Sequence, residues 1–253
     1  MTNVEPITPV ADKFGVLRQV VELARAKANE RVRKAKEEGA FTREAYVRFL
    51  LNQYHLTNGV QRALLRVAAS ARLAKKRKLR DFLFKFALDE EPHFLLAESD
   101  LKALGENTAP QPLESAIWWA YFNSTLDTEP FQRLGGTCIL ENIGVGLGEV
   151  LKPLFATKDF LRADTTRFLR IHLHEEIPHG DQVLGVLEEA HLEERDLDEL
   201  LMGARIAAVI YLRMMEWYFD SDALVRTFRP IREIPHAPLP TVTPTVSQMT
   251  SIR

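Results

Sequence analysis

Histidine and carboxylate side chains occur together in two short segments of this chain. In the segment FALDEEPHFLL, Glu90 precedes His93 by three residues. At about 100° per residue, such a pair lies about 60° apart on one face of an α-helix. Glu90 and His93 can therefore direct a carboxylate oxygen and an imidazole nitrogen at one metal ion. Asp89, four residues before His93, is the alternative carboxylate.

The segment FLRIHLHEEIPHGDQVL holds a second and larger group. His172, Glu176 and His179 follow one another at spacings of four and three residues. On a helix, all three would lie within about 60° of one direction. His174 falls near the opposite face and Glu175 at its margin. Imidazole and carboxylate ligands suit iron, manganese or zinc, whereas calcium and magnesium prefer shells of oxygen atoms.

A third carboxylate stands in an apolar segment. Glu141 is the one acidic residue between Leu134 and Leu147 in GGTCILENIGVGLGEVL. A carboxylate buried in a helix is costly unless it is paired or bound to a metal, so Glu141 is predicted to be a ligand from a third helix. The three segments would then supply three carboxylates and three imidazoles. Two divalent cations would nearly neutralise the carboxylates and leave positions open for O2 and substrate.

Each segment also has an ordinary structural interpretation. Taken alone, Glu90 and His93 are more typical of a surface pair than of two metal ligands. For His172, Glu176 and His179 the two interpretations are evenly matched, because an amphipathic helix without a metal would also have to place a second histidine on that face. The three segments taken together favour a metal site over the ordinary interpretation.

Helices must position these side chains, because the chain is rich in Ala, Leu, Glu, Arg and Lys and lacks alternating β-branched segments. We expect an all-α fold, a single-domain bundle of about seven helices. Thr42 is predicted to cap the second of them. The expected helices cover approximately residues 10–37, 43–73, 78–105, 113–126, 131–154, 165–190 and 197–219.

Composition limits the class of protein. A chain of 253 residues with 46% hydrophobic residues can build one large core. We expect residues 1–228 to form a helical catalytic domain and the Pro- and Thr-rich residues 229–253 to form an extended or disordered tail. The 33 basic and 35 acidic residues give a net charge of −2, which argues against a dedicated nucleic-acid-binding protein.

The location is predicted from the chain's ends and its single cysteine. The segment MTNVEPITPV has no basic stretch followed by an apolar one, and no apolar run approaches the ~20 residues of a membrane helix. Cys138 alone excludes an internal disulfide. We therefore expect a soluble, cytoplasmic protein that does not engage a membrane, with a homodimer as the default oligomer.

Three segments resemble the haem-oxygenase-like di-iron oxidases and oxygenases, over about residues 35–220. EEGAFTREAYVRFLLNQYHLT resembles the family's early loop and aromatic helix, and GGTCILENIGVGLGEVL resembles its helix with a metal-binding Glu before a glycine-rich turn. HLHEEIPHGD resembles its His-x3-Asp-x2-His signature, from which Glu176 departs by one methylene group. The resemblance implies that two Fe(II) ions are bound by six residues: Glu90, His93, Glu141, His172, Glu176 and His179.

The resemblance also implies an activity. Such enzymes activate O2 without haem and oxidise small organic molecules that are amino-acid-like or fatty-acid-like. The reactions are N-oxygenation, desaturation or oxidative C–C cleavage, often in natural-product biosynthesis, and an external reductant can take part. A haem oxygenase would instead need an axial histidine in its first helix, and no histidine precedes His55.

Other functions remain open. A ferritin-like di-iron carboxylate protein would also carry paired Glu-x-x-His motifs, although His172 on the second motif's face argues against it. A thiaminase-II-like hydrolase of the same fold would use Cys138 as its nucleophile and leave six metal-type residues without a purpose. A non-enzymatic helical scaffold would fold without regard to iron.

Residues that contact the substrate are harder to predict than the ligands. Tyr54, His55 and Trp118 are candidates, although packing between helices is the more ordinary role for each. Candidates to bind a substrate carboxylate are three arginines that precede the histidine group: Arg162, Arg167 and Arg170.

Overall fold

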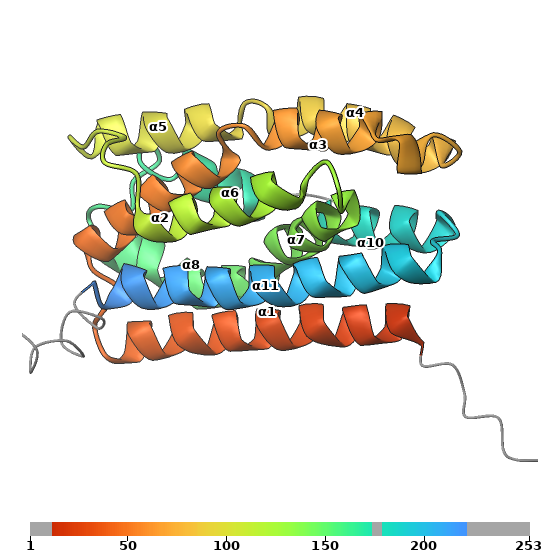
Figure 1. Ribbon diagram of the computed structural model, residues 1–253. Helices are drawn as coiled ribbons and strands as arrows, with labels where there is room; N and C mark the ends of the chain where they lie inside the picture. The colour runs from red at the N-terminus through yellow and green to blue at the C-terminus, as the bar shows by residue number, and fades with distance from the viewer. Residues whose placement is uncertain (1–11, 174–178, 222–253) are drawn as a thin grey trace, which may run out of the picture. The chain divides into compact units, whose positions relative to one another are not determined.

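The computed structural model describes residues 12–173 and 179–221, and it confirms the all-α prediction for them (Figure 1). These residues form helices and no strand. In chain order the helices are α1 (Lys13–Glu37), α2 (Arg43–Thr57), α3 (Val60–Ala69), the 3-10 helix η1 (Ala71–Leu73), α4 (Arg77–Glu90), α5 (His93–Ala103), α6 (Leu113–Thr125), α7 (Pro130–Ile143), α8 (Leu147–Thr157), α9 (Arg167–Leu173), α10 (His179–Glu189) and α11 (Glu194–Phe219).

The prediction of about seven helices was too coarse, because several expected helices are broken. Gly59, with φ +104°, separates α2 from α3, and Gly146, with φ +86°, starts α8 after a bend from α7. Glycine adopts such positive φ values without a steric penalty. Pro92 separates α4 from α5, because proline cannot donate the backbone hydrogen bond that would continue the helix. The expected helix over residues 165–190 is represented by α9 and α10.

Thr42 caps α2 as predicted. Its side-chain oxygen accepts the Ala45 backbone N–H at 3.2 Å, which satisfies one of the free donors at a helix start. α1 and α11 are the longest described helices, at 25 and 26 residues. The described helices belong to one compact unit that ends at Ser221. The predicted tail, residues 229–253, lies outside the described residues.

Glycines bring α7 and α11 into backbone contact. A Cβ added at Gly203 of α11 would lie 1.9 Å from the Gln132 carbonyl oxygen, and one at Gly135 of α7 would lie 2.1 Å from the Leu200 carbonyl oxygen. Only residues without a side chain permit this approach. α7 is buried over most of its length, so a side chain on it, such as Glu141, is held inside the bundle.

The other long helices stack beside this pair. α1 packs against α11, α11 against α2, and α2 against α5, as Figure 1 shows from the bottom of the view to the top. Among the described residues no single helix has the length and apolar character to cross a membrane; α7 and α8, bent by 51° at their junction, pass that test only as a pair.

Candidate metal centre

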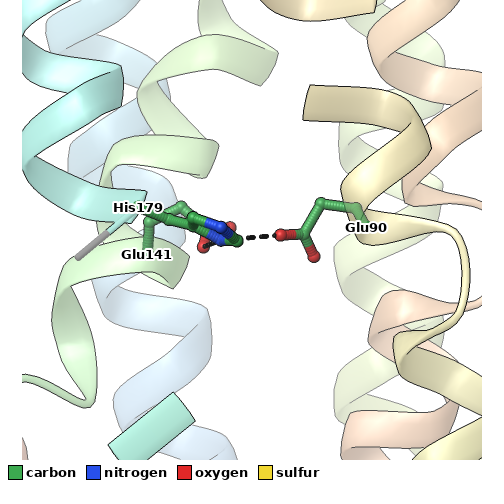
Figure 2. Close-up of side chains that lie close together, drawn as sticks. All are labelled: Glu90, Glu141 and His179. Carbon is green, nitrogen blue, oxygen red and sulfur yellow. Dashed lines mark ion pairs between the residues drawn. The ribbon is translucent and has the colours of Figure 1, made fainter. Parts of the chain in front are cut away.

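Three side chains from three helices converge inside the bundle (Figure 2). Glu90 ends α4, Glu141 lies in the last turn of α7, and His179 begins α10. Each offers one ligand atom, and these atoms all lie within 4.8 Å of one another. His179 Nδ1 is 3.0 Å from Glu90 Oε1 and 3.7 Å from Glu141 Oε2. In Figure 2, Glu90 reaches toward the other two side chains from the opposite side. Two carboxylates and an imidazole at this spacing form a group that could hold a metal ion.

His93 joins this group through Glu90. His93 Nδ1 lies 2.8 Å from Glu90 Oε2, and the two residues are only 3% and 4% exposed. The predicted contact is therefore present, but its predicted cause was wrong, because Pro92 breaks the helix between them and places His93 at the start of α5. Of the two carboxylates considered beside His93, Glu90 contacts the histidines, whereas Asp89 is exposed.

His172 approaches the group from α9. Its ring centroid is 5.0 Å from that of His93. Its Nδ1 lies 2.7 Å from the Phe168 carbonyl oxygen, and because a carbonyl can only accept, Nδ1–H is the donor. In the neutral imidazole, this leaves the lone pair that a metal needs on Nε2. Glu176, the remaining predicted ligand, lies outside the described residues, as do His174 and Glu175.

Burial and pairing shift the pKa values of Glu90 and Glu141 in opposite directions. Burial alone would raise the pKa of Glu90, but hydrogen bonds from His179 and His93 outweigh it and lower that pKa to about 2. Burial and the neighbouring Glu90 charge raise the pKa of Glu141 to about 7. Glu90 also raises the pKa of His93 despite its burial, so both His93 and Glu141 hold a proton more tightly than they would in water. A divalent cation that replaced such protons would release them on binding.

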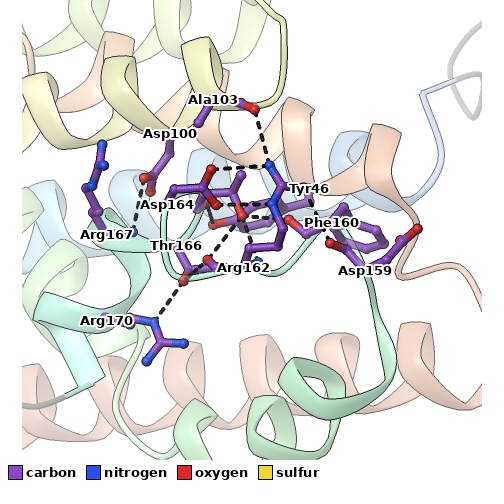
Figure 3. A network of polar contacts seen from close by, with 11 residues as sticks. Tyr46, Asp100, Ala103, Asp159, Phe160, Arg162, Asp164, Thr166, Arg167 and Arg170 are labelled. Atoms are coloured by element: carbon purple, nitrogen blue, oxygen red, sulfur yellow. Dashed lines mark hydrogen bonds and ion pairs between the residues drawn. The ribbon is translucent and has the colours of Figure 1, made fainter.

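A polar network holds the start of α9 (Figure 3). The buried Asp100 carboxylate on α5 accepts the backbone N–H groups of Arg167 and Phe168 at 3.0 and 2.9 Å. The Tyr46 hydroxyl donates to the Thr165 carbonyl oxygen at 2.7 Å. These bonds tie α9 to α5 and α2, and they thereby set the position of His172 at its other end.

The three arginines predicted as carboxylate binders serve this same segment. Arg162 donates to Asp164 and to the Ala103 carbonyl oxygen, and the Nε–H of Arg170 donates to the Thr166 hydroxyl at 2.8 Å. Arg167 donates to the Ser99 hydroxyl. None of the three arginines lines the large cavity described next.

A cavity of about 380 Å³ opens beside the candidate ligands. Glu90, Glu141 and His172 line part of it, and most of the remaining lining is apolar, from α1, α2, α8, α9 and α11. The polar side chains Gln53 on α2 and Tyr211 on α11 also face it, and the Gln53 Nε2–H donates to the Tyr211 hydroxyl at 3.1 Å. The sequence reasoning missed both residues, because α2 and α11 are distant in the chain.

The predicted substrate residues lie elsewhere. Trp118 is fully buried against Phe122, with ring centroids 4.6 Å apart. Tyr54 packs edge-on against Phe94 and His55. His55 lines a second pocket, of about 290 Å³, between α2, α3 and α6. None of Tyr54, His55 and Trp118 lines the large cavity.

A buried arginine near the centre was also missed. Arg133 on α7 is 0% exposed, and its guanidinium lies about 6 Å from the rings of Trp118, Trp119 and Phe122. Burial lowers the pKa of Arg133 to about 10, although Glu141 and Glu90 act to raise it. This cation offsets part of the buried carboxylate charge. Its signal in the sequence is a charged residue in the apolar helix two turns before Glu141.

Cys138 does not have the properties of a nucleophile. The side chain is 0% exposed, and burial raises its pKa to about 12. Reactive cysteines are accessible and have lowered pKa values. The environment of Cys138 therefore argues against the thiaminase-II-like alternative.

Comparison with known proteins identifies the fold. No protein-family model matches the chain, and no curated protein matches it in sequence. Among solved structures, it is similar to the crystal structure of a domain of unknown function with a haem oxygenase-like fold from Shewanella denitrificans OS217. The two chains are 21% identical, the TM-score is 0.70, and the match covers 86% of this chain and 96% of that one. At this identity the similarity shows the fold alone. The chain therefore has a haem-oxygenase-like fold, as its sequence motifs predicted.

Proposed function

We propose that this protein is a non-haem di-iron enzyme that activates O2 to oxidise a small organic substrate. The observation that supports this most strongly is the convergence of Glu90, Glu141 and His179 beside an apolar cavity. His93 and His172 adjoin that group. Carboxylate oxygens with imidazole nitrogens are the donor set that iron accepts in O2-activating proteins.

The burial of two of these ligands fits resident cations. A buried carboxylate or imidazolium is costly unless its charge is balanced. Glu90 is 4% exposed and His93 is 3% exposed, and neither side chain is apolar. The three-residue group offers enough donors for one ion; His93, His172 and Glu176 are the proposed further ligands for a second.

The chain's own residues would prepare the site. Bound Fe(II) ions supply the electrons that reduce O2. Phe86 packs edge-on against the His179 ring, with centroids 5.1 Å apart, and Phe168 packs against His172 at 4.5 Å, so both imidazoles are held in orientation. The apolar part of the cavity wall would keep water away from the bound substrate and so limit side reactions.

The cavity distinguishes this function from the ferritin-like alternative. A protein that only oxidises and stores iron needs a path for ions, whereas an enzyme needs room for an organic molecule beside its metal. A cavity of about 380 Å³ lies in the size range of small-molecule sites. The reaction would be N-oxygenation, desaturation or oxidative C–C cleavage, with an external reductant completing the electron balance where it is needed.

Anaerobic titration with Fe(II) tests the proposal. We expect about two ions per chain and a transient absorption after an O2 pulse. Glu90→Gln should lose iron, while the matched variant Asp89→Asn, one residue away but exposed, should retain it. Glu141→Gln should behave like Glu90→Gln. Retention of iron by both glutamine variants, or absence of bound iron in the unmodified chain, would refute the proposal.

A further inference from the structure

Three uncharged polar groups lie together in one part of the wall of the large cavity, which is mostly apolar apart from the candidate ligands. Gln53 comes from α2, while Tyr211 and Tyr218 come from α11, seven residues apart and therefore on the same side of that helix. The three side chains are 7%, 8% and 2% exposed. Placing polar groups in an apolar wall costs free energy unless they bind something, so their role needs an explanation.

Hydrogen bonding among the three is incomplete. The Gln53 Nε2–H donates to the Tyr211 hydroxyl at 3.1 Å. The buried hydroxyl of Tyr218 makes no hydrogen bond of good geometry with a described residue, although the Gln53 and Tyr211 side chains lie close enough to affect its pKa. A native structure rarely leaves a buried hydroxyl unsatisfied, so a group that enters the cavity is expected to complete the set.

The chemistry of the three groups selects an uncharged partner. An amide and two phenols can donate and accept hydrogen bonds but carry no charge, and burial raises the pKa of Tyr211 to about 12, so that its phenol stays neutral. No Lys or Arg occurs among the described residues that line the cavity, whereas Glu90, Glu141 and Glu149 do. The desolvation of an anionic group in this cavity would therefore not be compensated.

From these observations we infer that Gln53, Tyr211 and Tyr218 form the recognition subsite for one uncharged polar group, a hydroxyl or carbonyl, on a mainly aliphatic substrate. The aliphatic part occupies the apolar remainder of the cavity, between residues such as Val32 on α1 and Met215 on α11. This inference rests on the proposed function, because it names the substrate class of the same site. It favours an aliphatic alcohol, aldehyde or ketone over an amino acid.

Two eight-carbon probes test the inference by calorimetric titration: octan-1-ol and octanoate. The full chain is titrated with a chelator present, so binding needs no iron, O2 or turnover, and the result is independent of whether the di-iron function holds. We expect octan-1-ol to bind at least tenfold more tightly than octanoate. Equal or tighter binding of octanoate would overturn the inference.

Tyr218→Phe is the decisive variant, because it removes a hydroxyl that makes no hydrogen bond of good geometry with a described residue. It should keep the melting temperature of the unmodified protein or raise it, and it should weaken octan-1-ol binding by about three- to tenfold, the value of one hydrogen bond. Gln53→Leu should weaken the same probe. The matched control Tyr121→Phe removes a hydroxyl that donates to Gln132 outside the cavity and should leave octan-1-ol binding unchanged. Unchanged octan-1-ol affinity in Tyr218→Phe would refute the subsite.

Discussion

Replacing Asp100 by alanine should loosen the helix that carries His172. D100A leaves the backbone N–H groups of Arg167 and Phe168 without their acceptor at the start of α9. Two hydrogen bonds to a charged group could contribute about 3–6 kcal/mol. However, burial raises the pKa of Asp100 despite both bonds, so the bonds do not fully compensate the desolvation of the carboxylate. The net loss in the free energy of unfolding should therefore be about 2 kcal/mol, as for the stronger helix caps.

The same variant should weaken iron binding, because α9 ends one residue beyond His172. A loss of 2 kcal/mol corresponds to about 30-fold in affinity, which is the upper limit for this effect. Urea unfolding measures the stability, and anaerobic Fe(II) titration measures the affinity. D100N keeps one acceptor oxygen and should recover part of both losses.

A matched control removes the N-terminal cap of a helix that carries no predicted metal ligand. Thr42→Ala deletes the single bond to the Ala45 N–H at the start of α2 and should lower the free energy of unfolding by about 1 kcal/mol, with iron affinity unchanged. If D100A bound iron as tightly as Thr42→Ala, or had the unmodified protein's urea midpoint, Asp100 would not be the residue that stabilises α9.

Three further predictions concern other parts of the bundle. Gly203→Ala places a Cβ 1.9 Å from the Gln132 carbonyl oxygen, so it should lower the free energy of unfolding by about 1–3 kcal/mol. The matched variant Gly185→Ala places a Cβ that meets nothing within 4 Å. In urea unfolding it should be neutral or stabilising by up to about 1 kcal/mol. Cys138, whose pKa burial raises to about 12, should not react with a disulfide reagent at pH 8 until guanidinium unfolds the chain. Burial lowers the pKa of His55, so folding favours its neutral form. The stability this contributes is present above pH 6.5 and is lost as the pH falls below it, and the stability advantage over His55→Gln should therefore shrink between pH 7 and pH 5.

Contrary results would be equally informative. Gly203→Ala with unchanged stability would mean that α7 and α11 are not in backbone contact. Rapid labelling of Cys138 in the folded chain would reopen the hydrolase alternative. A stability difference for His55→Gln that stayed constant with pH would show that folding does not change the protonation of His55.

Local features of the sequence predicted much of the fold. Helix-forming composition and the absence of alternating β-branched segments indicated an all-α protein, and Thr42 was correctly placed as a cap. These features depend on neighbouring residues, so the sequence displays them directly. The continuous helix predicted from Glu90 to His93 was wrong, because Pro92 cannot donate the backbone hydrogen bond that would continue it.

The candidate ligands could be chosen from the sequence for a similar reason. A histidine or glutamate in an apolar helix stands out by its type, and five of the six predicted ligands, all but Glu176, lie together in the described residues. Spacing could not show which of their atoms meet. Those distances depend on how α4, α7, α9 and α10 pack, and therefore on contacts such as that between Gly203 and the α7 backbone.

What the sequence by itself determined was the helical class of the chain and the chemistry of its candidate ligands, because both follow from residue types and short spacings. Only the tertiary structure decided the rest: the cap of α9 by Asp100, 67 residues earlier, and the cavity wall where Gln53 meets Tyr211, 158 residues later. Such contacts join residues that no periodicity relates. They exist because packing of the apolar helix faces brings distant polar groups within hydrogen-bonding distance.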